Sequence, residues 1–404
     1  MSHSGASVTL RTSKGLVLDL VRSSGPISRV ELAERTGLTP ATMTNVVRQL
    51  LAEGLVLETG RERSTGGKPR VLIDVNPTAR YAIGVQLGAD SLTYVVTNLS
   101  GAIVARLRTV GASDAPPAEQ IARMAHDIDT LIGDLALRSD SIIGIGLVAP
   151  GPQDLERGVL LAPPSLPRWS DFPLRDALGD ATGRSVLLDN DATAAAVGEF
   201  WGGAAPDAST MCVVYMGAGI GAGILIDGTV YRGASSNTGE LGQLWIASPS
   251  SGARADTLER ISGPAGVVAA TAAAIANGST TSLTLRGKDP FSDFTTISTA
   301  ATLGDELAVE SITHSAEDLA ESIGIAATLL DLDWVILAGP AFAVAGSLYV
   351  GVVKERLART LFARPRHAIE VRLSTHPTDA AAVGAAALVL QDRLAPRTFG
   401  VEPR

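Results

Sequence analysis

Apolar positions near the start of the chain recur at helical spacing and are separated by polar breaks. The first helix is expected over residues 8–23, before Gly25-Pro26, with the apolar positions Leu16, Val17, Leu20 and Val21. A second should cover residues 28–36, because Gly37 suits a left-handed C-cap. A third opens at Thr39-Pro40, an N-cap followed by proline, and runs to Gly54. Two short helices joined by a glycine-containing turn are typical of a helix-turn-helix.

The polar face of this third helix and the segment after it carry candidate nucleic-acid contacts. Strands expected at 55–57 and 71–75 flank a basic, glycine-tipped loop, which together form a wing. The helix would enter the major groove, and the wing would reach the backbone or the minor groove. The predicted DNA-binding residues are Thr39, Thr42, Thr44, Asn45, Arg48, Arg63, Lys68 and Arg70. The alternative is a small helical dimerisation module whose charges are only solvated.

From residue 80 the pattern changes to short apolar strands separated by turns. Strands and helices in alternation, appearing twice, indicate two α/β lobes with a cleft between them. We therefore expect a winged helix-turn-helix over 1–78 and an α/β domain over 79–404, with the lobe boundary near 189. A C-terminal helix over 378–392 should return to the first lobe. Strands are expected over 81–87, 91–98, 103–110, 141–149, 186–188, 211–216, 223–226 and 334–337.

Charge is distributed unevenly along the chain. Residues 1–75 hold 10 Lys and Arg against 7 Asp and Glu, a net charge of +3, while the rest carries −12, for −9 overall. Nucleic acid repels an acidic protein, so the basic N-terminal segment indicates where DNA contact occurs. The one cysteine, Cys212, excludes a disulfide framework. No leader-like segment and no apolar run of about 18 residues occur, so a cytoplasmic protein is expected.

Five motifs follow one another in the second part of the chain. They are 146–152 (GLVAPGP), 188–199 (LDNDATAAAVGE), 216–233 (MGAGIGAGILIDGTVYRG), 239–243 (GELGQ) and Leu258-Glu259. Their order resembles the ROK family, which groups sugar-responsive repressors with bacterial sugar kinases. The resemblance implies a two-lobed actin/hexokinase-like domain, here joined to the winged module that family regulators have and family kinases lack. It implies a sequence-specific transcriptional regulator of carbohydrate metabolism, expected to be a repressor, controlled by a sugar bound between the lobes.

The resemblance also implies which residues contact the sugar. The family's catalytic base corresponds to Asp191, which would bind sugar hydroxyls together with Asn190, Glu240, Gln243 and Glu259. Ser165 lies in a stretch that also approaches the sugar in the family. Carboxylates suit this role because each accepts from two vicinal hydroxyls. Alternatively, Asn190 and Asp191 only cap the helix that follows them.

The resemblance also implies where a kinase of the family would bind its nucleotide. The family's first phosphate loop, Asp-x-Gly-Gly-Thr, reads here Gln86, Leu87, Gly88, Ala89 and Asp90. Loss of the metal-side carboxylate and gain of one beside the phosphate disfavour nucleotide binding. We therefore expect no enzymatic activity and a vestigial base at Asp191, and we read 217–223 as a strand connection. Two alternatives remain: an ATP-dependent sugar kinase with a DNA-binding arm, and a DNA-binding scaffold that answers to a protein partner.

No cofactor is expected. The family's zinc-binding histidine is replaced by Gln243, and residues 248–257 lack the family's cysteines, so too few ligands remain for zinc. The expected partners are double-stranded operator DNA, a small sugar or sugar derivative, and a second copy of the chain. A homodimer is expected because helix-turn-helix readers usually address two half-sites. A higher assembly is left open.

Overall fold

A computed structural model describes residues 4–61, 70–113, 115–205, 208–247, 255–287, 289–360 and 368–395. The chain divides into two compact units, and each is described by itself. Unit 1 comprises Met1–Asp189, Phe200–Pro206 and Ala382–Arg404, and unit 2 comprises Asn190–Glu199 and Asp207–Ala381. Within the described ranges, no helix has both the length and the apolar character needed to cross a membrane.

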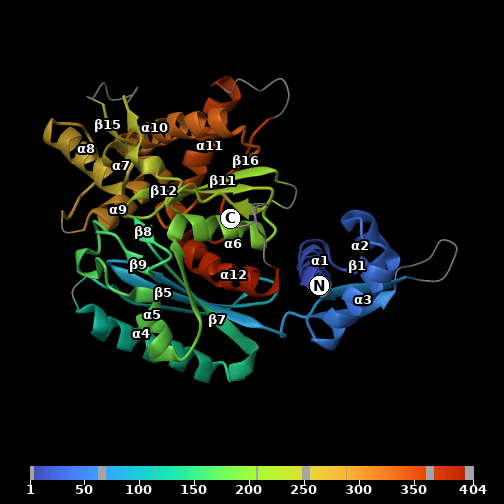
Figure 1. The fold of residues 1–404 in the computed structure, drawn as a ribbon. Coiled ribbons are helices and arrows are strands. Elements are labelled where there is room, and N and C mark those ends of the chain that lie inside the picture. The colour runs from blue at the N-terminus through green and yellow to red at the C-terminus, as the bar shows by residue number, and fades with distance from the viewer. Residues whose placement is uncertain are drawn as a thin grey trace. The chain divides into compact units, whose positions relative to one another are not determined.

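The N-terminal part of unit 1 is a winged helix-turn-helix (Figure 1), as predicted. Thr39 caps the second helix of the motif, accepting a bond from the Thr42 amide, and Gly37 adopts the left-handed conformation (φ 68°) between the two helices. A short strand that was not predicted completes a three-stranded sheet of order β1-β3-β2. The elements are α1 (Ser4–Ser24), β1 (Ile27–Ser28), α2 (Arg29–Thr36), α3 (Pro40–Ala52), β2 (Val56–Arg61) and β3 (Val71–Val75).

One detail of the first helix differs from the prediction. Leu16, expected on the apolar face, is 47% exposed, whereas Val17, Leu18 and Val21 are fully buried. The buried stripe of α1 is thus rotated by about one position, because tertiary contacts and not spacing alone select which apolar side chains are covered.

The rest of unit 1 is a five-stranded sheet of order β10-β7-β4-β5-β6, with α4 and α5 on one face and α12 on the other (Figure 1). Gly84 and Gly146 permit the close approach of α12, because a Cβ there would lie 1.8 and 1.9 Å from the carbonyl oxygens of Ala382 and Ala385. The elements are β4 (Tyr81–Leu87), β5 (Ser91–Asn98), β6 (Ile103–Val110), α4 (Pro117–Asp134), η1 (Ser139–Ser141), β7 (Ile142–Ala149), β8 (Gln153–Asp154), β9 (Val159–Leu160), η2 (Pro167–Trp169), α5 (Leu174–Thr182), β10 (Val186–Asn190) and α12 (Ala380–Leu394).

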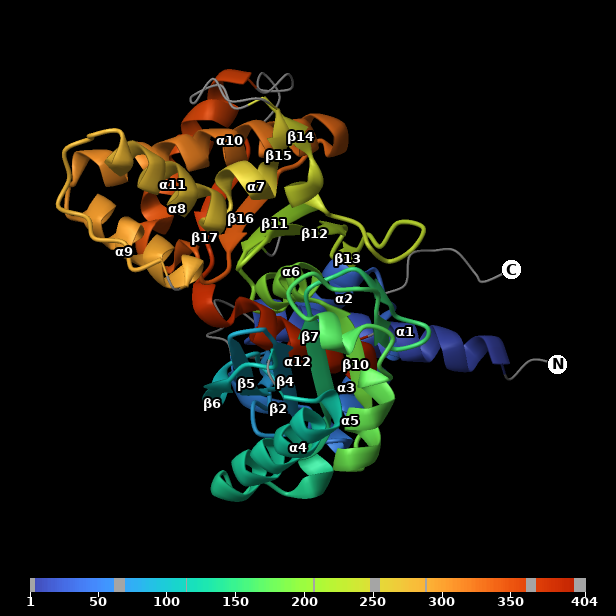
Figure 2. The same cartoon turned by 90° about the vertical axis from the view of Figure 1, so that its left-hand side faces the viewer.

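Unit 2 is built on a second five-stranded sheet, of order β13-β12-β11-β16-β17. Figure 2 shows α8, α9, α10 and α11 gathered on one side of this sheet and α6 on the other. The elements are α6 (Asp191–Trp201), β11 (Thr210–Met216), β12 (Ile220–Ile226), β13 (Thr229–Val230), η3 (Leu241–Gln243), β14 (Trp245–Ile246), β15 (Asp256–Thr257), α7 (Leu258–Ser262), α8 (Pro264–Ala276), α9 (Pro290–Thr302), α10 (Glu306–Leu330), β16 (Trp334–Ala338), α11 (Phe342–Thr360), β17 (Glu370–Leu373) and η4 (Pro377–Asp379).

The glycine-rich stretch 217–223 is mostly strand, in agreement with its reading as a strand connection. β12 begins at Ile220, three residues before the predicted start, and pairs antiparallel with β11. A Cβ on Gly223 would lie 2.3 Å from the Ala192 carbonyl oxygen and 2.6 Å from the Ala196 Cβ. This glycine is therefore needed for α6 to pack directly on the strand.

Candidate DNA-binding and ligand-binding sites

The α3 helix presents a polar face to solvent, and its opposite face fills the core of the module. Thr39, Thr44, Asn45 and Arg48 are exposed and Thr42 is half-buried. The buried positions are Met43, Val46, Val47 and Leu50. Because the apolar side is used for packing, these exposed side chains are the ones that a DNA groove could meet.

Some of the predicted DNA-binding hydroxyls already have partners within α3. The Thr39 and Thr42 hydroxyl oxygens lie 3.0 Å apart, and the Thr44 hydroxyl donates to the Pro40 carbonyl over 2.8 Å. These bonds hold the threonine side chains in fixed rotamers at the start of the helix. Among the wing residues, Arg70 is exposed at the start of the returning strand, whereas Arg63 and Lys68 lie outside the described residues.

Unit 2 brings three of the predicted sugar-binding carboxylates together. The pKa of Asp191 is raised to about 6, because burial and the nearby charges of Glu240 and Glu259 outweigh the lowering effect of a hydrogen bond from the Ala192 amide. Burial and the charge of Glu259 also raise the pKa of Glu240. Three carboxylates that interact electrostatically form a cluster of hydrogen-bond acceptors suited to a hydroxyl-rich ligand.

Asn190 occupies the N-cap of α6, as the capping alternative predicted. Its Oδ1 accepts from the amides of Ala192 (2.9 Å) and Thr193 (3.2 Å). The Asp191 carboxylate accepts from the same Ala192 amide over 2.8 Å. Both side chains are thus fixed by the first turn of α6, and capping is compatible with ligand contact because each carboxyl or amide oxygen has more than one lone pair.

Glu259 is fixed by the glycine turn between β11 and β12. Its Oε2 accepts from the Ile220 amide over 2.8 Å. A Cβ on Gly219 would lie 2.3 Å from the same oxygen, so glycine at 219 makes room for the carboxylate. This contact was not predicted from the sequence, where the glycine run 217–223 is its one sign. Turn amides of this kind can bind phosphate, but here the Ile220 amide donates to the Glu259 carboxylate.

Two further predicted residues, Gln243 and Ser165, are exposed, and the backbone amide of Gln243 donates to the Glu240 carbonyl over 3.1 Å. Gln243 ends the short helix η3 and is exposed. Ser165 belongs to unit 1, where it is exposed just before η2. Their contribution to sugar binding stays a prediction.

The stretch that corresponds to the first phosphate loop is the hairpin turn between β4 and β5. Gln86 lies within β4, opposite Thr93, and Asp90 is exposed at the turn. The carbonyls of Gly88 and Asp90 accept from the amides of Ala112 (3.0 Å) and Gly111 (3.1 Å). The turn is thus held by the backbone of the segment that follows β6, and the charged group it exposes is a carboxylate.

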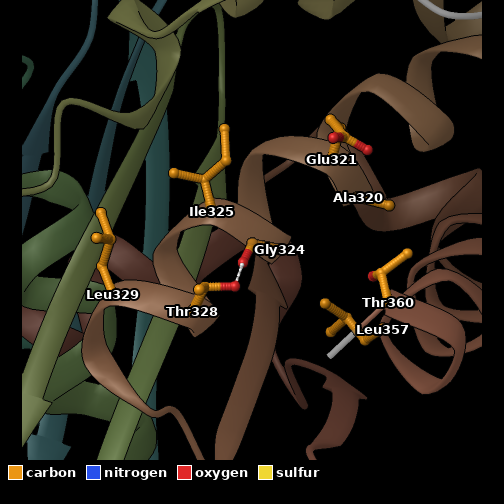
Figure 3. A pocket seen from close by; sticks show the side chains of 8 residues that line it. All are labelled: Ala320, Glu321, Gly324, Ile325, Thr328, Leu329, Leu357 and Thr360. Carbon is orange, nitrogen blue, oxygen red and sulfur yellow. Dashed lines mark hydrogen bonds between the residues drawn. The ribbon is translucent and has the colours of Figure 1, made fainter. Parts of the chain in front are cut away.

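One further depression lies away from the carboxylate cluster. A shallow depression of about 330 Å³ lies between α10 and α11 (Figure 3), lined by Ala320, Glu321, Gly324, Ile325, Thr328, Leu329, Leu357 and Thr360. It contains none of the predicted sugar-binding residues. Among the described residues, no three His, Cys, Asp or Glu side chains are arranged to hold a metal. Part of the stretch that carries zinc ligands in the family lies outside those residues, so the absence of zinc stays a prediction.

Comparisons with known proteins place these observations in a family. The model of the MarR family matches residues 11–63, and that of the ROK family matches residues 82–392. The chain is 29% identical to a putative xylose repressor from Caldicellulosiruptor sp. (strain Rt8B.4), over 95% of this chain and 96% of the relative.

Two solved structures share the fold. One is a ROK family transcriptional regulator, a homologue of the Escherichia coli MLC protein, with a TM-score of 0.76 and 24% identity over 95% of this chain and 96% of that chain. The other is a ROK family glucokinase from Streptomyces griseus in complex with glucose and AMPPNP, with a TM-score of 0.61 and 26% identity over 76% of this chain and 98% of that chain. Because the family model matches well over half of the residues, the chain belongs to the ROK family.

Proposed function

We propose that the chain is a sequence-specific transcriptional regulator, acting as a repressor of carbohydrate metabolism, whose DNA binding is controlled by a sugar. The observation that carries this proposal is the winged helix-turn-helix with its outward polar helix face on a ROK domain. The similar glucokinase is matched over 98% of its length but over only 76% of this chain, whereas the relative named as a repressor is matched over 95%. The match to the glucokinase leaves about a quarter of this chain uncovered, which is enough to hold the DNA-binding module.

The proposed effector is a neutral, unphosphorylated sugar held by the cluster of Asp191, Glu240 and Glu259 and by Asn190. Carboxylates accept hydrogen bonds from sugar hydroxyls, and they repel the charge of a sugar phosphate or sugar acid. D-xylose is the first sugar to test, because the similar relative is named a putative xylose repressor. The earlier expectation that the sugar lies between the lobes stays a prediction.

We further propose that the chain does not phosphorylate its sugar. Gln86 and Asp90 replace a metal-side carboxylate and a phosphate-binding hydroxyl of the family, and Glu259 accepts the Ile220 amide of the second glycine turn. Both changes place negative charge or remove a ligand where a nucleotide phosphate needs donors and a metal. Asp191 would then act in sugar binding alone.

The proposed regulator binds double-stranded DNA in the cytoplasm as a homodimer. In this arrangement α3 of each copy reads one half-site, and half-sites about one helical turn apart match two readers related by a twofold axis. The dimer predicts an operator with twofold sequence symmetry.

The decisive experiment is a titration of the protein against the DNA upstream of its own gene, with and without D-xylose, D-glucose, N-acetylglucosamine and their phosphates. Specific binding released by a free sugar, and not by its phosphate, is expected. Specific binding that no sugar changes would remove the sugar effector and favour a protein signal. Loss of specific binding together with ATP-dependent phosphorylation that disappears in Asp191→Asn would establish the kinase alternative.

A further inference from the structure

Arg22 of α1 makes an unusual buried contact within unit 1, outside the sites described above. Its side chain is only 3% exposed, and it donates to the Asp19 carboxylate over 2.6 Å. It also donates to the carbonyl oxygen of Trp201, and its guanidinium carbon lies 4.1 Å from the centre of the Trp201 ring. One arginine of the DNA-binding module is thus bound by a hydrogen bond and a ring contact to the last residue of α6, while Asp19 of its own helix balances its charge.

A second contact joins the same helix α1 to the end of α12. A Cβ on Gly15 would lie 3.0 Å from the Cα of Ala395 and 3.6 Å from the carbonyl oxygen of Leu394. The backbone of α1 therefore rests directly on the C-terminal end of α12. Within unit 1, α1 is the helix of the DNA-binding module on which the ends of both α6 and α12 converge.

The other end of α6 carries the proposed ligand-binding residues. The helix begins at Asp191, directly after Asn190, and ends at Trp201. Every residue from Ala192 to Trp201 is buried, and Gly221 and Gly223 bring β12 against Ala192. A short, close-packed helix shifts as a body, because its interior contacts leave little room for local deformation. A displacement of Asp191 therefore also moves Trp201.

On the basis of the proposed function, we propose that the contact of Arg22 with Asp19 and Trp201 links the sugar site to the DNA-binding module. Sugar binding at the start of α6 repositions the module through this contact. Arg22 and Trp201 are positioning residues, and they touch neither sugar nor DNA.

The chemistry of the Arg22 contact is better suited to transmitting a movement of α6 to α1 than to stabilising the fold. Replacing a buried ion pair by apolar side chains is often neutral or stabilising, so stability alone does not require an arginine here. A hydrogen bond to a backbone carbonyl depends steeply on distance and angle, whereas apolar surfaces slide with little change in energy. A small shift of Trp201 therefore breaks the Arg22 bond and changes where α1 is held.

The test measures operator affinity with and without D-xylose in the full chain. In the wild type, D-xylose should weaken operator binding by about 5- to 150-fold, the usual range of allosteric coupling. In Arg22→Gln and in Trp201→Leu, which breaks the contact from the α6 side, the change should fall to within about twofold. The affinity for D-xylose without DNA, measured by calorimetry, should stay as in the wild type. Arg29→Gln is the matched control, because Arg29 pairs with Glu58 inside the module over 2.8 Å.

An Arg22→Gln protein that D-xylose releases from the operator as it does the wild type would overturn the inference. If no sugar releases the wild type, the proposed effector has failed, and hydrogen exchange over residues 13–24 decides instead. Asp191→Asn should change the exchange of α1 in the wild-type background and leave it unchanged in the Arg22→Gln background. Hydrogen exchange of α1 that Asp191→Asn leaves unchanged in the wild-type background, or changes equally in both backgrounds, would contradict the coupling.

Discussion

Asp191 combines burial, a helix N-terminus and two neighbouring carboxylates in one side chain. Burial and the charges of Glu240 and Glu259 act against ionisation, while the Ala192 amide favours it, and the balance raises its pKa to about 6. The residue is thus ionised at neutral pH and protonated in a mildly acidic medium. In the proposed sugar site, its protonation state would decide how many sugar hydroxyls it can accept from.

We expect sugar affinity to fall as the pH falls through about 6. Above that pKa the carboxylate accepts hydroxyl donors, and below it the bound proton removes an acceptor, at a cost of up to about tenfold in affinity per pH unit. Calorimetric titration of D-xylose between pH 5 and 8 measures the effect. Asp191→Asn should bind more weakly at pH 8 and show a flatter pH profile. A variant that retains the full wild-type dependence would assign the titration to another group.

Arg48 and Lys68 should affect DNA binding in different ways. Arg48 is exposed on α3, so Arg48→Ala should cost about 1–3 kcal/mol on the specific operator and little on unrelated DNA. Lys68→Ala should weaken both kinds of DNA similarly and reduce the salt dependence of binding by about one counterion. Fluorescence anisotropy at several salt concentrations separates the two, and thermal melting checks that the fold is intact. Equal affinity of both variants and the wild type would remove the groove and wing assignments.

At the scale of elements, glycines set how closely helices lie on the sheets. α12 rests on Gly84 and Gly146 of the first sheet, and α6 rests on Gly221 and Gly223 of the second. Neither approach could be recognised as packing from the sequence, where Gly221 and Gly223 belong to a glycine run that also suits a phosphate-binding loop. The approach matters because α6 links the proposed sugar site to the contact with α1.

Gly223→Ala should lower the free energy of unfolding by about 1–3 kcal/mol, the usual cost of overpacking. The added Cβ would meet the Ala192 carbonyl oxygen at 2.3 Å, so α6 must move away from β12. Gly133→Ala is the control, since nothing lies within 4 Å of a Cβ there and the residue is in the helix α4. Denaturant unfolding of both variants measures the difference. A Gly223→Ala protein as stable as the control would show that α6 shifts at no cost.

Local signals account for the elements that the sequence predicts well. β4, β5 and β6 have the predicted bounds because their apolar runs end at clear turns, and α3 is set by Thr39, Pro40 and Gly37. The two-residue strand β1 is too short to leave a pattern, and the start of β12 is hidden by glycines. The helices α8 to α11 were not assigned, since a segment such as Pro264–Ala276 is apolar on all sides and shows no helical period.

The candidate site was predictable only in its residue types. The motifs indicate Asp191, Glu240 and Glu259, and the structure brings these three close enough to interact electrostatically, while their role in sugar binding stays a prediction. The bond from Ile220 to Glu259 joins residues 39 positions apart, and that from Arg22 to Trp201 joins residues 179 apart. Contacts at such separations depend on the folded arrangement, which one sequence does not specify by its local pattern.

At the scale of the whole molecule, ligand binding should appear as added stability. A sugar that binds only the folded protein stabilises it by about 2.7 kcal/mol at 100 times its dissociation constant. Thermal unfolding with D-xylose should therefore shift upward in the wild type and stay unshifted in Asp191→Ala. Gln243→Ala should show a smaller loss, because Gln243 is exposed. A shift that persists in Asp191→Ala would mean that the sugar binds elsewhere.

The carboxylate that accepts the Ile220 amide also has a consequence for when such a regulator responds. If the proposed acidic site binds the sugar, it would respond to sugar that has entered the cell and has not yet received a phosphate. The proposed response would then follow uptake and not the later consumption of the sugar, and it would end when phosphorylation removes the free form. The regulator would thus release its genes in advance of the enzymes that need them, and would restore repression as those enzymes deplete the signal.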